Sequence, residues 1–331
     1  TIGPTPECKW YCDRTNLYNP NRSGSKPKTI SHCCFYESGH ETFSKPLQIV
    51  RIKRMKYFFT LISFTTFACG CNNYHLAFIE PGDDPHFKIV ANSDRGTKRF
   101  KRKVVVFGVD VYASSKVNDT KLLHVANVLA QYLDNNEDGE VDDLNVLAKL
   151  HENKAYLVLW NTPLDWFRSF VPDRIGQDLG NDEIMPKYVI EGQTGQFDAS
   201  LEEVLHLVHH AGLSKAYPDV FGQSHGSELA IAMDLARGGY FEEIPEEYPA
   251  TAWYTYTDKT CDYASCQTIE YLYWALTSVI GVQQNRLHEI GHEWTLNTKN
   301  KVATTDTAIY RLLTDPRYSM PAVTPDGSYR H

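Results

Sequence analysis

Apolar residues recur at helical spacing on both sides of one acidic segment in the chain. The apolar positions are Leu122, Val125, Leu129 and Tyr132 before the segment and Leu144, Leu147 and Leu150 after it. Side chains three or four residues apart lie on one face of an α-helix. The pattern therefore predicts two helices over residues 119–153 that are joined by a short polar loop.

Strand patterns flank this helix pair, and further helical patterns follow it. The run VVVFGVDVYA begins after residue 103 and AYLVLW covers 155–160, and both are rich in residues that favour strands. A second extended run, KYVIEGQ, covers 187–193. Helical spacing returns at 200–211, 228–237, 268–280, 286–294 and 305–313. A few strands followed by many helices predict an α+β fold that is rich in helix.

The acidic segment at 134–145 reads DNNEDGEVDDLN. Side-chain oxygens occupy its positions 1, 3 and 5, at Asp134, Asn136 and Asp138. Gly139 at position 6 permits a sharp turn, and Asp142 supplies an oxygen at position 9. Ca²⁺ requires oxygen ligands at this spacing, so the segment is a candidate calcium loop.

The segment and its flanking helices resemble a single EF-hand. The resemblance implies calcium held by Asp134, Asn136, Asp138, the main-chain carbonyl of Glu140, Asp142 and Asn145. Asn145 stands at position 12, where the family has a bidentate Glu, so we expect a weak site with a Kd of about 10⁻⁴–10⁻³ M. The alternative is an acidic loop between two helices that binds no ion.

Charge divides the chain unevenly. Residues 103–331 contain 33 acidic and 17 basic side chains, whereas residues 1–102 contain 8 acidic and 16 basic ones. A strongly acidic part repels nucleic acid and anionic membranes and attracts cations. No stretch is long and apolar enough for a transmembrane helix. We therefore expect calcium ions, and mineral or extracellular matrix components, as partners, with no nucleic acid and no membrane span.

The N-terminal third has the features of a secreted precursor. Met55 opens the sequence MKYFFTLISFTTFACG, in which a lysine precedes an apolar run and small residues follow it. This layout predicts a signal peptide over 55–70, and the alternative is a buried strand or short core helix. Residues 1–54 show no periodicity, so we expect a doubtful leader or a disordered segment there. Their four cysteines leave a small disulfide module open as well.

Several short motifs agree with secretion. The sequence RFKR ends at Arg102 and resembles the site cut by furin-like processing proteases. A cut there would make 71–102 a propeptide or linker and release an acidic globular domain over 103–331. Asn118 opens an Asn-Asp-Thr acceptor for N-glycosylation. Cys261 and Cys266 are expected to form a disulfide, and a two-cysteine metal half-site is the alternative.

Two helical patterns downstream carry candidate zinc ligands. In LEEVLHLVHHAG, His206 and His210 are four residues apart, so both imidazoles are expected on one helical face. In TIEYLYWALTSVIG, Glu270 is the only charged residue, and a buried carboxylate requires a partner. These three residues form a candidate His₂Glu set. We expect the Glu270 carboxylate to lie within about 6 Å of the His206 ring.

This helix pair resembles part of a zincin metallopeptidase. In an alignment with the family motif HExxH, Glu202 replaces the first His, Glu203 is the general base and His206 is the second His. The helix of Glu270 resembles the glutamate helix of the family. The resemblance implies zinc bound by Glu202, His206 and Glu270. If His206 and His210 are the ligand pair instead, the base position holds a leucine, so the site is compatible with a working or a degenerate enzyme.

A complete HExxH motif occurs separately as HEIGH at 288–292. His288 and His292 are an alternative zinc pair, with Glu289 as the general base. Asp306, in ATTDTAIY, resembles the aspartate motif of aspzincins and is the candidate third ligand. The residues after the motif lack the Gly and His of metzincins. The competing interpretation is an amphipathic surface helix that binds no metal.

Two functions are compatible with these features. The first is a secreted, acidic, calcium-binding protein of the extracellular matrix with an inactive zincin-like site. Its composition resembles secreted skeletal and shell matrix proteins of marine invertebrates, which act in biomineralisation. The second is a calcium-stabilised, secreted zinc metalloendopeptidase. We favour the first, because every candidate zinc set departs from its family pattern.

Overall fold

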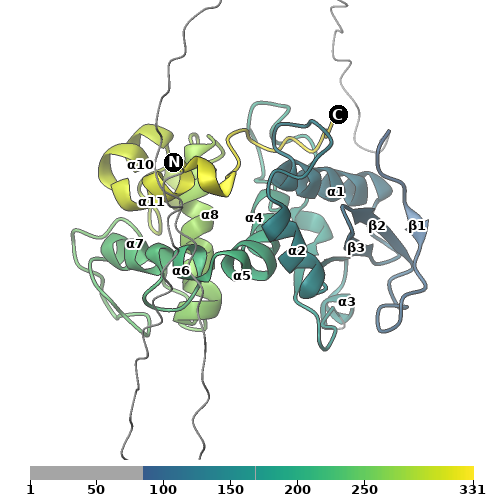
Figure 1. Ribbon diagram of the computed structural model, residues 1–331, viewed down its shortest axis with the longest axis horizontal. Coiled ribbons are helices and arrows are strands. Elements are labelled where there is room, and N and C mark those ends of the chain that lie inside the picture. Colours follow the sequence, from purple (N-terminus) through teal and green to yellow (C-terminus); the bar gives the residue numbers. More distant parts are fainter. Residues whose placement is uncertain (1–84, 168) are drawn as a thin grey trace, which may run out of the picture. The chain divides into compact units, whose positions relative to one another are not determined.

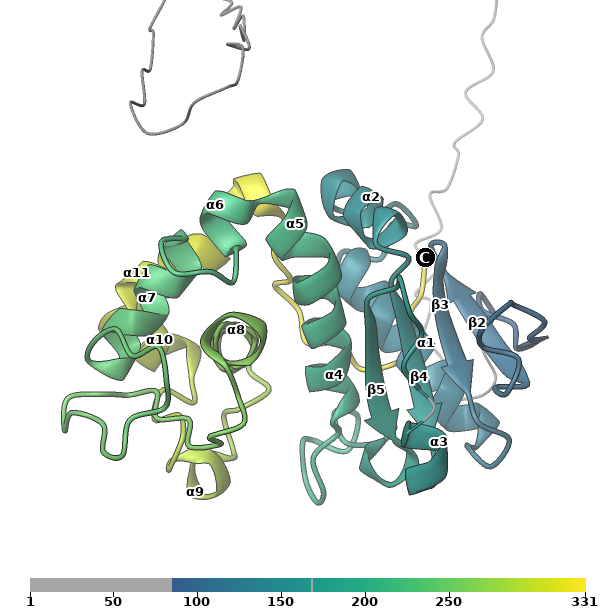
Figure 2. The ribbon, with the colours of Figure 1, turned by 90° about the horizontal axis from the view of Figure 1, so that it is seen from below.

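Five strands pair into one mixed sheet in the described part of the chain. They are β1 (Val90–Ala91), β2 (Arg102–Val106), β3 (Val109–Ala113), β4 (Tyr156–Trp160) and β5 (Gly176–Gly180), and they lie side by side in this order. Figure 1 shows β1 to β3, and Figure 2 shows β2 to β5. The first three strands are antiparallel, whereas β3, β4 and β5 are parallel. The extended run predicted after residue 103 is thus a hairpin.

Helices α1 (Asp119–Leu133) and α2 (Leu144–Glu152) carry the chain from β3 to β4 (Figure 1). Parallel neighbours cannot be joined by a tight turn, so a crossover of this kind is required. α1 packs on β2 and β3 and contributes its apolar face to the main core. Both helices and the loop between them lie where the apolar spacing predicted them.

Helix α4 (Ser200–Leu207) lies between the sheet and the C-terminal helices (Figure 2). It contacts β4 and β5 on one side and α8 (Thr268–Val279) on the other. A π-helical segment, η2 (Val208–Leu213), continues α4 and packs on α2. The short helices α5 (Ser214–Ala216) and α6 (Pro218–Phe221) follow.

The C-terminal half is helical and is centred on α8. This helix contacts α7 (Glu228–Arg237), α10 (Lys299–Thr305) and α11 (Thr307–Leu313). Ten of its twelve residues are buried, as expected for a helix that is apolar on nearly every face. Glu270 is therefore held in a packed interface between helices.

The structure describes residues 85–167 and 169–331, so the predicted leader (1–54) and signal peptide (55–70) lie outside the described residues. The remaining described elements are α3 (Pro163–Phe167), α9 (Leu287–Ile290), η1 (Asn181–Glu183), η3 (Tyr263–Gln267) and η4 (Pro316–Tyr318). The fold is α+β, as predicted. Of the helices in these described ranges, none combines the length and the apolar character needed to cross a membrane.

Two predicted elements are wrong or shortened, and one strand was not predicted. Residues 187–193 form turns instead of a strand, and the sheet gains β5, whose sequence GQDLG carries almost no strand signal. Gly176 in β5 lies under the Tyr156 ring, where a Cβ would approach Cζ to 2.2 Å, so packing selects a glycine against strand propensity. The helix predicted at 286–294 is the single turn α9.

Residues on both sides of the predicted boundary after Arg102 belong to one sheet. Residues 85–102 belong to the same compact unit as the acidic domain, and Ala91 pairs with Arg102 across the sheet. The Arg102 guanidinium forms an ion pair with Asp119 and donates a hydrogen bond to the Ser114 carbonyl at 3.0 Å. A processing protease would have to open this strand pair before it could cut after Arg102.

A buried polar network fixes the start of α4 against α1. The Asp198 carboxylate accepts hydrogen bonds from His124 Nε2 (2.7 Å), the Ser200 hydroxyl (2.6 Å) and the Met185 amide (2.9 Å). Asp198 and His124 are almost completely buried. Buried polar groups of this kind are costly when they lose a partner, so the network holds α4 in one position.

We expect Asp198→Ala to lower the free energy of unfolding by about 3–5 kcal/mol, because it leaves several buried groups without an acceptor. Urea denaturation followed by circular dichroism measures this loss. The matched control is Asp219→Ala on α6, where the side chain is exposed and the expected change is within about 0.5 kcal/mol. Equal losses in the two variants would contradict a structural role for the network.

Candidate functional site

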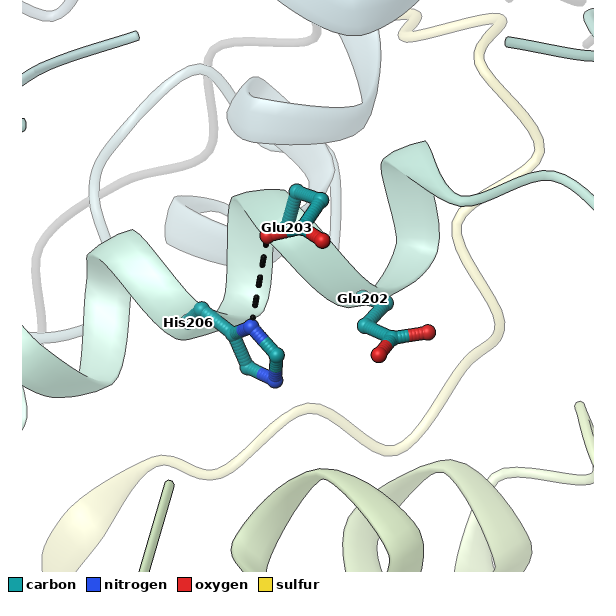
Figure 3. Close-up of side chains that lie close together, drawn as sticks. All are labelled: Glu202, Glu203 and His206. Atoms are coloured by element: carbon teal, nitrogen blue, oxygen red, sulfur yellow. Dashed lines mark ion pairs between the residues drawn. The ribbon is translucent and has the colours of Figure 1, made fainter. Parts of the chain in front are cut away.

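One turn of α4 brings an imidazole and two carboxylates together. Glu202, Glu203 and His206 each offer a ligand atom, and these atoms lie within 4.8 Å of one another. Figure 3 shows Glu202 and His206 on the same side of the helix, with Glu203 joined to His206 by an ion pair. The positions follow from helical geometry, because residues three and four apart share a face.

The His206 ring lies between carboxylates from two helices. Its Nδ1 atom is 3.3 Å from Glu203 Oε2, and its Nε2 atom is 3.6 Å from Glu270 Oε2 on α8. The predicted contact between His206 and Glu270 is therefore confirmed. Nε2 is buried and has no hydrogen-bond partner, since 3.6 Å exceeds hydrogen-bonding distance. This nitrogen faces the Glu270 carboxylate between the two helices.

The pKa values of the cluster are shifted, because several carboxylates surround one imidazole. Burial and the neighbouring Glu270 carboxylate raise the pKa of Glu202 to about 8. Burial alone would lower the pKa of His206, but Glu270 and Glu203 outweigh it and raise the value to about 10. Burial also raises the pKa of Glu270. The cluster therefore attracts positive charge, either as protons or as a metal ion.

Supporting residues hold the cluster in place. The Gln177 side chain on β5 donates a hydrogen bond to Glu203 Oε2 at 2.5 Å. The Tyr273 ring packs edge-on against His206, with 5.6 Å between the ring centroids, and its hydroxyl accepts a hydrogen bond from Gln283 at 3.1 Å. Gln177 was not predicted as part of the site, because β5 itself carries no strand signal. Periodicity along α8 would have placed Tyr273 three residues after Glu270, on the same face.

His210 does not belong to this cluster. The chain changes from α-helix to π-helix at Val208, and the wider turn removes the alignment expected for residues four apart. His210 Nδ1 instead pairs with the Gln223 amide at 3.0 Å. The predicted set of His206, His210 and Glu270 is thus wrong for His210. Of the alternative set, Glu202 clusters with His206 and Glu203, and Glu270 lies 3.6 Å from His206.

The second candidate zinc set is not brought together. His288 and His292 lie on the surface, with side chains 78% and 72% exposed. Asp306 is buried, and its Oδ2 atom accepts hydrogen bonds from Trp253 (2.8 Å) and Tyr271 (2.7 Å). Its other oxygen caps α11, so Asp306 has a structural role. The helix that carries the HEIGH motif, α9, ends after one turn, and Glu289 forms an ion pair with Arg286.

The acidic loop between α1 and α2 is organised by its own backbone. Asp134 is buried, and its Oδ2 accepts from the Gly139 amide (2.8 Å) while Oδ1 accepts from the Asp138 amide (3.2 Å). Asn136 Oδ1 and Asp138 Oδ1 accept from the amides of Asp138 and Glu140. Gly139 has φ +90°, a conformation that favours glycine. The loop therefore makes the sharp turn predicted at this position.

The other predicted calcium residues lie at different places around the loop. Asp142 Oδ2 accepts a hydrogen bond from the Asn135 amide at 2.7 Å, and burial with the nearby loop acids raises its pKa. Asn145 is exposed and donates to the Tyr217 hydroxyl at 3.2 Å. Among the described residues, the loop carboxylates do not meet the close spacing seen at His206. A cation would have to draw them together.

The C-terminal segment closes over the acidic loop, which the sequence analysis missed. Tyr329 is buried, and its hydroxyl donates a hydrogen bond to Asp134 Oδ2. Gln131 Oε1 accepts from the amides of Asp326 (3.0 Å) and Gly327 (2.8 Å). Asn135 likewise binds the backbone of residues 322 and 323. Nothing in the local sequence indicates these contacts, which join residues about 190 positions apart.

The remaining predicted sites have simple positions. Cys261 and Cys266 form the expected disulfide, with their Cα atoms 5.2 Å apart. Asn118 is exposed at the N-cap of α1, as expected for a glycosylation acceptor, although its Oδ1 also caps the Thr120 amide at 2.8 Å. Glycosylation itself stays a prediction.

No protein-family model, no curated protein and no solved structure matches this chain. The proposed function therefore rests on the chemistry of the site.

In protein stripped of metal, we expect the melting temperature to fall as the pH rises from about 5 to about 9. The pKa of Glu202 in the folded state, about 8, lies above its ordinary value, so its stabilising proton is bound at low pH and lost as the pH passes about 8. The raised pKa of His206 acts in the same direction up to about 10. Scanning fluorimetry across this range measures the effect.

Glu202→Gln is the matched variant for this prediction, because glutamine keeps the shape of the protonated acid without its titration. The variant should lose much of the pH dependence and should melt above the wild type at the alkaline end. Parallel pH profiles for the two proteins would show that Glu202 does not titrate in this range.

Proposed function

We propose that the protein is a secreted zinc-dependent hydrolase of the metallopeptidase type. Glu202, His206 and Glu270 would hold the metal, and Glu203 would act as the general base. The observation that supports this most directly is the His206 ring between Glu203 and Glu270, with a buried Nε2 that lacks a hydrogen-bond partner. The same contact is expected of an inactive zincin-like site in a matrix protein, which the sequence alone favours, and hydrolysis that depends on Glu203 would distinguish the two functions.

Two of the proposed ligand atoms have a spacing that suits a zinc ion. Zinc binds imidazole nitrogen and carboxylate oxygen at about 2.0–2.2 Å, so two of its tetrahedral ligands are separated by about 3.4 Å. His206 Nε2 and Glu270 Oε2 are separated by 3.6 Å. The excess of carboxylates around one imidazole also favours a cation, because buried acids of like charge repel one another. Neither helix needs to move for the ion to fit between these two atoms.

Glu203 is placed for proton transfer. Its side chain is 24% exposed, more than that of His206, and Gln177 fixes one of its oxygens. A carboxylate held in this way can accept a proton from a water and return it to the leaving amine. A bound zinc ion would supply Lewis-acid polarisation of the reactants. Burial of the surrounding helix limits the access of other water to the site.

The test is zinc binding and hydrolysis by purified protein. We expect one zinc ion per chain at this site. His206→Ala and Glu270→Gln should each lower the zinc affinity by more than about 100-fold, because the loss of a residue that only supports a ligand already lowers affinity by up to about that factor. Glu203→Gln should keep the zinc and lower the rate of casein hydrolysis by about 10²–10⁴-fold. His288→Ala is the matched control, since its ring is exposed, and should change neither quantity.

Unchanged zinc affinity in His206→Ala would reject the metal site. Zinc binding without any hydrolysis that depends on Glu203 would reject the enzyme. The protein would then be better described as a matrix protein with an inactive zincin-like site.

A calcium-binding role is the second candidate, and it does not compete with the first. Asp134 Oδ2 is held by Gly139 and Tyr329, whereas Oδ1 accepts a single long hydrogen bond from the Asp138 amide. Oδ1 is therefore the oxygen that Asp134 can offer to an ion. The acidic surface would attract calcium, and calcium-rich extracellular surroundings would favour occupancy of a weak site.

Millimolar calcium should stabilise the protein by about 1–2 kcal/mol if Kd is near 10⁻⁴ M. Asp134→Ala should abolish this gain. Tyr329→Phe is the matched variant: it should cost about 1.5–3 kcal/mol through the lost hydrogen bond to a charged group but keep the calcium-dependent gain. Melting curves with and without calcium measure both effects. If calcium stabilised Asp134→Ala as much as the wild type, the stabilisation would come from diffuse surface charge and the loop site would be rejected.

A further inference from the structure

A cavity of about 460 Å³ opens beside the free edge of β5. Its lining includes the side chains of Tyr156, Trp166, Phe167, Phe170, Asp178 and His210. Phe167 and Phe170 are 79% and 74% exposed, and Trp166 is 47% exposed. Several large aromatic rings that stay exposed around one cavity are typical of a binding surface.

Asp178 places a carboxylate in this aromatic cavity. Its Oδ2 atom accepts a hydrogen bond from Trp160 Nε1 at 2.7 Å. Burial raises the pKa of Asp178, and the nearby Glu203 and Glu183 carboxylates raise it further. The carboxylates of Asp178, Glu203 and Glu183 therefore repel one another, and a cation nearby would relieve this repulsion.

The other polar groups of the cavity do not offset this charge. Arg174 also lines the cavity, but its guanidinium donates to Asp110 (3.1 Å), the Tyr112 hydroxyl (2.9 Å) and a main-chain carbonyl (2.8 Å). Burial lowers the pKa of His210, so its ring is neutral at physiological pH. The uncompensated charge of the cavity is therefore negative.

We propose that this cavity binds the cationic side chain of a lysine or arginine in a peptide substrate. Cations are attracted to the faces of aromatic rings and to carboxylates, and the cavity offers both around one space. A neutral apolar side chain would gain the ring contacts but would bring no positive charge to the Asp178 carboxylate. The proposal rests on the proposed hydrolase function, whose specificity it would define.

The position of the cavity supports this role. Gln177 is part of its lining, and the same side chain donates its hydrogen bond to Glu203. His210, which also lines the cavity, follows His206 on the continuous helix formed by α4 and η2. A peptide whose side chain fills the cavity would thus have its backbone beside the proposed general base.

Binding of short peptides to protein stripped of metal with EDTA tests the proposal without turnover. The probes are acetyl-Gly-Lys-Gly-amide and its norleucine counterpart, which has an apolar chain of similar length and no charge. Isothermal titration calorimetry should give the lysine peptide a Kd about tenfold lower or better. Asp178→Asn should remove this preference, and Trp166→Leu should weaken the binding of the lysine peptide by about tenfold.

Asp173→Asn is the matched control, because this exposed acid lies in the same segment and outside the cavity lining. It should leave both affinities unchanged. Equal binding of the two peptides, or an unchanged preference in Asp178→Asn, would overturn the proposal. Binding that prefers lysine in a protein without zinc-dependent hydrolysis would support the cavity and reject the enzyme. Zinc-dependent hydrolysis without a preference for basic residues would support the enzyme and reject the proposed role of the cavity.

Discussion

Helix α4 is packed on both sides, and this constraint gives the site its character. The sheet covers one side of the helix and α8 covers the other. Six of its eight residues are buried, and the partly exposed ones are Glu202 and Glu203. Acidic side chains at such a position cannot all keep their negative charge without a nearby cation. The interface between α4 and α8 is thus stable only when something positive is bound in it.

Protons and a metal ion satisfy this requirement in different ways. Without metal, the raised pKa values of Glu202, His206 and Glu270 show that the cluster retains protons. Metal ligands must be deprotonated, so an ion would have to displace these protons and its affinity would rise with pH. Protons that the cluster retains in neutral solution would therefore compete with a divalent cation for the same ligand atoms.

Helical periodicity predicted the main features of this arrangement, and local exceptions to it account for the errors. The contact between His206 and Glu270 was predictable, because a single carboxylate in an apolar helix must face a partner. The π-helical turn that displaces His210 depends on packing against α2, which no local pattern encodes. β5 was missed for a similar reason: Gly176 is selected by the Tyr156 ring above it. Contacts of the C-terminal segment are similarly non-local.

Helix α1 connects the acidic loop with the start of α4. Its C-terminal end leads into the loop at Asp134, which the C-terminal segment covers through Tyr329. Earlier in the same helix, His124 pairs with Asp198 directly before α4. The C-terminal segment also packs on this pair, since a Cβ at Gly327 would lie 1.9 Å from His124 Nδ1. An ion that stabilised the loop would therefore stabilise the element that holds α4, and with it the geometry around His206.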